Sequence, residues 1–176
     1  MPADQHREAP GIGSLPAGEI PVRFDQAERL LGHTDVSGWV TIDREHLREF
    51  GHATYLDPAY VDLSPSRNHV LGPDLVDGFL LLSLVVHFEF AAPLVRTDGR
   101  YGYNYGLDRV RFTAPVFAGQ AVRVRREVAD VRRKSASRVL VTVDHVMEAG
   151  GVPGPPVMVA RWLSLFVDGG AEREAQ

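Results

Sequence analysis

Several side chains that can take up or release protons lie close together in the middle of the sequence: three carboxyl groups, one imidazole and one phenol. Asp57, Asp62 and Asp77 lie within one irregular stretch and its exit, and Tyr60 and His69 lie among them. Such side chains move protons in enzymes when their pKa values come near the working pH. These five residues are therefore the candidate catalytic groups of the sequence.

Each candidate also has an ordinary structural role. Asp77 precedes a glycine and an apolar run, which favours a helix N-cap. Asp57 precedes a proline, as in many turns. Asp62 and His69 suit an exposed loop, and Tyr60 suits a packed aromatic side chain. The sequence leaves both roles open at each position.

Other kinds of chemistry have little support. The chain has no cysteine, no His-x-x-x-His spacing and no glycine-rich phosphate loop, so we expect neither a metal nor a nucleotide cofactor. Its 176 residues are 44% apolar and 24% charged, an ordinary balance for one globular domain. A net charge of −4 argues against nucleic-acid binding. No apolar run is long enough to span a membrane and no secretory signal is visible, so a cytoplasmic location is expected.

The first half of the chain predicts short elements. Residues 1–20 lack apolar periodicity and are rich in glycine and proline, which predicts a mobile tail before a single domain over 21–168. A short C-terminal tail over 169–176 would follow. Apolar spacing predicts an amphipathic helix over 44–54, with Asp43 as its N-cap.

One long helix stands out in the middle. The segment opened by Asp77-Gly78 and closed by Pro93 is apolar all round, so we expect a helix buried on nearly every side. His87 inside it is expected to be a hydrogen-bonded core histidine.

The second half predicts a sheet. Polarity alternates over 121–134, 137–149 and 156–167, with turns between them. On the second of these strands His145 shares a face with valines and a methionine, so it either packs in the core or points into a ligand tunnel. The outer face would be rich in arginine. One antiparallel sheet wrapped around one long helix is the simplest α+β arrangement.

Three stretches resemble the MaoC-like dehydratase family, in particular its NodN-type branch. They are Ser37–Ile42 with the helix ending Phe50-Gly51-His52-Ala53-Thr54, then Asp77–Leu84, and then Asn104–Phe112 followed by Ala114-Pro115-Val116 and Gly119. The third is the most specific, because so long a run rarely arises by chance. The resemblance covers residues 30–166 and implies a hot-dog fold.

Members of this family act on acyl thioesters of coenzyme A or of acyl carrier protein, and add or remove water at the α,β double bond. Their active site lies in a tunnel between two subunits, so the resemblance implies a homodimer. It also implies that the backbone N–H of Gly78 polarises the thioester carbonyl. Asn104 and Tyr105 would line the tunnel, and Arg111 would either neutralise a carrier phosphate or form a salt bridge.

The family's catalytic Asp and His do not both carry over. The corresponding stretch reads Ala53-Thr54-Tyr55-Leu56-Asp57-Pro58-Ala59-Tyr60-Val61-Asp62 and contains no histidine. Depending on the gap, the Asp position falls on one of residues 55–57 and the His position on one of residues 60–62. The family's His-Gly before the long helix is Asp77-Gly78 here.

The family resemblance, together with the changed catalytic pair, leads to three hypotheses about function. The first is a non-standard enzyme that dehydrates, hydrates, isomerises or cyclises an acyl or polyketide-like substrate in specialised biosynthesis, carried by coenzyme A, by a carrier protein or free. The second is an acyl-binding subunit without catalysis of its own. The third is a hot-dog thioesterase that uses Asp77 and the helix N-terminus.

Overall fold

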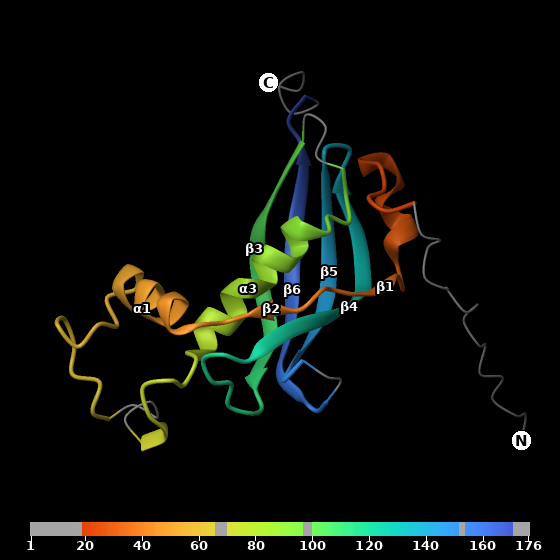
Figure 1. The fold of residues 1–176 in the computed structure, drawn as a ribbon. Helices are drawn as coiled ribbons and strands as arrows, with labels where there is room; N and C mark the ends of the chain where they lie inside the picture. The colour runs from red at the N-terminus through yellow and green to blue at the C-terminus, as the bar shows by residue number, and fades with distance from the viewer. Residues whose placement is uncertain (1–18, 66–69, 97–99, 152–153, 171–176) are drawn as a thin grey trace, which may run out of the picture.

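The structure is a computed structural model that describes residues 19–65, 70–96, 100–151 and 154–170 (Figure 1). His69 and nearly all of the two predicted tails lie outside the described residues, so these predictions stay untested.

A six-stranded antiparallel sheet forms the body of the molecule, and one helix, α3, lies across its inner face (Figure 1). Neighbouring strands follow the order β1-β4-β5-β6-β3, and β2 also pairs with β4. The strands are β1 (Thr34–Val36), β2 (Val40–Thr41), β3 (Arg100–Phe112), β4 (Ala121–Ser135), β5 (Arg138–Ala149) and β6 (Pro156–Asp168). The predicted α+β arrangement of a sheet around a long helix is confirmed.

Among the described residues, the helical elements named here are η1 (Phe24–Leu30), α1 (Arg44–Ala53) and α3 (Gly78–Ala91). The predicted N-cap of α1 is confirmed, because the Asp43 carboxylate accepts a hydrogen bond from the His46 N–H at 3.0 Å. α1 and the irregular chain after it extend beyond one end of the sheet (Figure 1). They thus stand next to the start of α3.

α3 begins at its predicted N-cap, but the expectation that it is buried on nearly every side is wrong. Its buried residues are Leu81, Val85, Phe88 and Glu89, whereas Phe79 and Phe90 are 65% and 76% exposed. His87 is also exposed rather than a core residue. The sheet covers only one face of the helix, and an all-round apolar sequence cannot indicate which face that is.

The core lies between α3 and the inner face of the sheet. Leu81 and Val85 pack there with Val124 of β4, Met147 of β5 and Trp162 of β6. His145 shares this inner face and is 1% exposed, so its expected core position is confirmed. On the outer face, Arg123 and Arg125 both pair with Glu148.

Candidate functional site

The site is built around the first turn of α3. The Asp77 carboxylate accepts a hydrogen bond from the Phe79 N–H at 2.7 Å and so caps the helix. The Val76 N–H donates to the Val116 carbonyl at 2.8 Å, which holds the entering chain in place. Among the described residues, nothing accepts a hydrogen bond from the Gly78 N–H. An amide at a helix N-terminus is a ready partner for an oxygen that gains negative charge.

Gly78 is required by close packing. A Cβ placed on it would lie 3.0 Å from three ring carbons of Phe112, and the rings of Phe79 and Phe112 meet edge to face with centroids 6.1 Å apart. Phe112 ends strand β3, so the sheet edge reaches the start of the helix at this point. The absence of a side chain lets the aromatic ring lie directly against the helix backbone.

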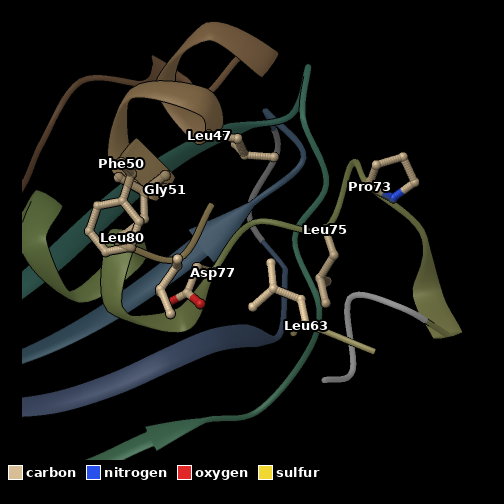
Figure 2. A pocket seen from close by; sticks show the side chains of 9 residues that line it. Leu47, Phe50, Gly51, Leu63, Pro73, Leu75, Asp77 and Leu80 are labelled. Carbon is tan, nitrogen blue, oxygen red and sulfur yellow. The ribbon is translucent and has the colours of Figure 1, made fainter. Parts of the chain in front are cut away.

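A hollow of about 230 Å³ opens beside Asp77, between α1, the irregular chain and α3. Figure 2 shows the carboxylate of Asp77 among leucine side chains, with Phe50 and Gly51 of α1 close to Leu80. The lining residues are Leu47, Phe50, Gly51, Leu56, Leu63, Pro73, Leu75, Asp77 and Leu80. Of these, Asp77 alone is ionisable, so it is the group that would exchange protons with a ligand in this hollow.

An ion pair holds α1 near the start of α3. Arg44, in the first turn of α1, donates to both oxygens of Asp74 at 2.6 and 2.7 Å. The guanidinium keeps the pKa of the Asp74 carboxyl below its usual range. This bidentate pair ties the chain just before Asp77 to α1.

Three other predicted catalytic groups, Asp57, Tyr60 and Asp62, are not part of the lining of this hollow. Asp57 accepts from the Ala59 N–H at 2.8 Å and Asp62 from the Ser64 N–H at 2.9 Å, each in a local turn. The backbone bond keeps the pKa of the Asp62 carboxyl below its usual range. Tyr60 is exposed and its ring meets that of Tyr55 edge to face, with centroids 5.3 Å apart. Neither aspartate nor Tyr60 lines the hollow.

A second flank of α3 borders a groove that runs along β3. Phe79, Leu82, Ser83 and Val86 lie on one stripe of the helix and line its first part, a cavity of about 270 Å³. The predicted binding residues Asn104 and Tyr105 line this part from β3. Arg111 lies elsewhere: it is exposed, and its Nη1 donates to the Val110 carbonyl at 2.7 Å.

The groove continues into a smaller cavity of about 80 Å³ under the C-terminal half of α3. Asn104 and Trp162 line both cavities, so the two are adjacent parts of one groove. Glu89 of α3 and Ser164 of β6 line the second part together with aromatic residues. Both parts are therefore largely apolar, and the second part also contains the side chains of Glu89 and Ser164.

Glu89 belongs to a buried polar network. Its Oε1 atom accepts from His145 Nε2 at 2.8 Å and lies 3.0 Å from Arg126 Nη1. Arg126 also donates to Asp35 on β1 and, at 3.0 Å, to the Ala92 carbonyl at the end of α3. Glu89 and Arg126 played no part in the predicted site. Their signal in the sequence is a charged residue within an otherwise apolar helix and one on the apolar face of a strand.

The described residues offer neither a metal-binding group nor a membrane-spanning helix. No three or more histidine, aspartate or glutamate side chains of the described ranges are grouped as a metal ion would need. No helix in those ranges is both long and apolar enough to span a membrane.

Comparison with known proteins places these features in a family. Residues 29–149 match the model of the MaoC like domain. Nodulation protein N of Rhizobium leguminosarum bv. viciae is 32% identical over 156 residues, covering 86% of this chain and 91% of the relative. The 3-hydroxyacyl-thioester dehydratase Z of Mycobacterium tuberculosis is 31% identical over 133 residues, covering 74% and 86%.

Solved structures show the same fold. The MaoC-like dehydratase of Rhodospirillum rubrum superposes with a TM-score of 0.59, covers 78% of this chain and 92% of its own, and is 14% identical. At that identity the similarity shows the fold alone. It supports the hot-dog arrangement predicted from the sequence.

Proposed function

Because the chain belongs to the MaoC-like domain family, we propose that it adds or removes water, or moves a proton, beside the carbonyl of an acyl thioester. The observation that carries this proposal is Asp77: it is the ionisable side chain of an apolar hollow and directly precedes the Gly78 amide. The site thus has both a proton carrier and a carbonyl partner.

The substrate carbonyl oxygen accepts a hydrogen bond from the Gly78 N–H in this proposal. When the α-proton leaves, negative charge moves to that oxygen and forms an enolate, which the helix N-terminus stabilises. The amide is already oriented by the helix, so little reorganisation is needed as the charge develops. Phe112 covers Gly78 and excludes water from this side.

Asp77 carries the proton. One carboxylate oxygen stays bonded to the Phe79 N–H, and the other takes the α-proton of a 3-hydroxyacyl thioester. The resulting carboxyl group gives this proton to the 3-hydroxyl as the C–O bond breaks and water leaves, and the enolate electrons form the double bond. Hydration is the reverse. Asp77 is neutral while the enolate is charged, so the two do not repel each other.

The substrate class and assembly are part of the proposal. The Asp and His of the family do not both occur here, which favours a specialised acyl or polyketide-like substrate over general fatty-acid intermediates. It is carried as a thioester of coenzyme A or of acyl carrier protein. Isomerisation or cyclisation would use the same two groups. The enzyme acts as a cytoplasmic homodimer, in which a second copy covers the exposed side of α3.

One observation favours a second candidate function, an acyl-binding subunit without catalysis. The carboxylates of Asp57 and Asp62 bond to backbone N–H groups in local turns and do not line the hollow. If Asp77 serves only as a helix cap, the chain keeps the binding surfaces but has no proton carrier among the described residues of the hollow.

The substitution Asp77→Asn tests the proposal, because asparagine still caps a helix but does not transfer protons at neutral pH. The assay follows the enoyl thioester absorbance with a panel of 3-hydroxyacyl and 2-enoyl thioesters of increasing length. We expect an unchanged melting temperature and a loss of turnover of about 100-fold, the scale of one acid–base group. The matched control is Asp43→Asn, the same change at the cap of α1.

The outcomes separate the candidates. Turnover by Asp77→Asn within a few-fold of the unsubstituted chain would remove Asp77 from the mechanism. Tight binding of the thioesters without any turnover by the unsubstituted chain would favour the acyl-binding subunit.

A further inference from the structure

Two polar side chains that are almost wholly buried line the second cavity of the groove between α3 and β3. Glu89 is 9% exposed and Ser164 is 4% exposed, and both line the cavity of about 80 Å³. Among the described residues, the Ser164 hydroxyl has no hydrogen-bond partner. A hydroxyl that lines a cavity can bond to water or to a ligand there.

Neighbouring basic side chains already balance the charge of the Glu89 carboxylate. The Glu89 carboxylate is bonded to His145 and paired with Arg126, which also pairs with Asp35. A carboxylate that faces a guanidinium has little need of a second cation, but it retains lone pairs for a neutral donor. The Ser164 hydroxyl can supply the complementary donor. Together the two groups suit a ligand oxygen that both donates and accepts.

The cavity has room for such a group. A space of about 10–15 Å³ admits one water molecule, so about 80 Å³ holds a chain end of a few atoms. From Gly78 to Glu89 the helix advances 11 residues, about 16 Å at about 1.5 Å per residue, or roughly the length of a dozen carbons in an extended chain. An acyl chain whose carbonyl lies at Gly78, and which enters the groove beside Phe79, is therefore long enough to reach Glu89.

We infer that the acyl chain of the substrate carries a hydroxyl group far from its thioester, and that Glu89 and Ser164 bind this hydroxyl. The inference rests on the proposed function, since it places the carbonyl at Gly78. A plain alkyl end would displace water from both polar groups and replace none of its hydrogen bonds. A site built to bond a hydroxyl discriminates strongly against the analogue that lacks it.

Binding of matched probes tests this assignment. The probes are pantetheine thioesters of decanoic, dodecanoic and tetradecanoic acids, each with and without a terminal hydroxyl, measured by calorimetry on the full chain. We expect the hydroxylated member of at least one pair to bind about 10-fold more tightly or better, the scale of a hydrogen bond to a charged group. Equal binding within every pair would overturn the inference.

Two variants locate the effect. Ser164→Ala should reduce the preference to within about 3-fold, since it removes one of the two hydrogen bonds. The matched control is Ser135→Ala at the exposed end of β4, outside the groove, where the Ser135 hydroxyl lies 3.3 Å from that of Ser137. It should keep the full preference. A preference that Ser164→Ala leaves intact would contradict the assignment.

The result is separable from the proposed function. If the alkyl and hydroxylated probes bind equally and enoyl thioesters are still turned over, the proposed function stands and the inference fails. If no acyl probe of either kind binds, both fail.

Discussion

Gly78 lies where the ring of Phe112 meets the start of α3. A Cβ there would lie 3.0 Å from the Phe112 ring, and Phe112 is 40% exposed, so the ring has space to move outward. The conflict is therefore relieved by displacement of the ring rather than by unfolding. What is lost is the cover over the first helix amide.

The substitution Gly78→Ala should separate stability from activity. We expect the free energy of unfolding to change by less than about 1 kcal/mol, since alanine is a good helix former and the displaced side chain is partly exposed. Turnover of the best acyl thioester should fall by about 10-fold or more, because water then reaches the carbonyl partner. Urea denaturation and the enoyl absorbance assay measure the two effects. A variant with full turnover would contradict the role given to the Phe112 cover.

For single residues, the sequence indicated which side chains could transfer protons, but it did not indicate which residues they contact. Asp77 was recognisable because a cap and a glycine precede an apolar run, and the structure places it in a hollow. Asp57 and Asp62 have equally suggestive types, but their oxygens bond to N–H groups two residues away. Glu89 and His145 are 56 positions apart. Their pairing depends on how the helix lies on the sheet, which no local pattern describes.

Among the elements, α3 depends on the sheet at its C-terminal end. Glu89 lies between His145 of β5 and Arg126 of β4, and Arg126 also donates to the helix carbonyl of Ala92. Removal of one charge from a buried pair leaves the other uncompensated. The helix and three strands, including β1 through Asp35, are therefore coupled at one place.

Glu89→Ala should accordingly destabilise the fold by about 3–5 kcal/mol, the usual cost of breaking a buried pair. Urea denaturation monitored by circular dichroism measures this change. The control is Glu127→Ala on the exposed side of β4, for which we expect a change within about 0.5 kcal/mol. Similar small losses in both variants would show that the network contributes little.

The outer face of the sheet should respond to acid. The Arg161 guanidinium, which donates to both oxygens of Asp144 at 2.7 Å, keeps the pKa of that carboxyl below its usual range. A lowered folded-state pKa means that the pair stabilises the protein above the unfolded pKa of about 3.9. This contribution is lost as the pH falls through the folded-state value.

Asp144→Asn should therefore lower stability at neutral pH and leave it unchanged in strong acid. The pair is partly exposed and screened by solvent, so we expect a difference of less than about 1 kcal/mol. Unfolding midpoints in urea at about pH 7 and about pH 2 provide the comparison. A deficit of the same size at both pH values would contradict an electrostatic origin.

The elements differed in how far sequence predicted them. Strands β4, β5 and β6 alternate in polarity because one face meets the helix core, and the predicted ranges agree with the structure within about two residues. β3 was not predicted as a strand, and both of its faces are largely exposed in the structure. The three-residue β1 is too short to show a period.

At the scale of the whole molecule, two apolar surfaces lie side by side. The edge strand β3 exposes Tyr101, Tyr103, Tyr105 and Leu107, and α3 exposes Phe79 and Phe90. An exposed edge strand with large side chains readily pairs with another chain.

We therefore predict a homodimer formed along β3, with the exposed flank of α3 covered by its copy. Sedimentation equilibrium at micromolar concentration should give twice the mass of the chain. Tyr103→Lys should shift the equilibrium toward monomer, because lysine on an edge strand opposes pairing. A single species with the mass of one chain would contradict the prediction.

The position of α3 along the chain has a consequence for synthesis. Ribosomes add about 5–20 residues per second, so the 77 residues from Ala91 to Asp168 take about 4–15 s to make. During that interval the most apolar segment has emerged, but the sheet that covers its buried face does not yet exist. The nascent chain thus presents Leu81, Val85 and Phe88 to the cell, which makes it a natural client for chaperones that bind apolar segments. Slow translation of β4–β6 would lengthen this exposure and lower the yield of folded protein.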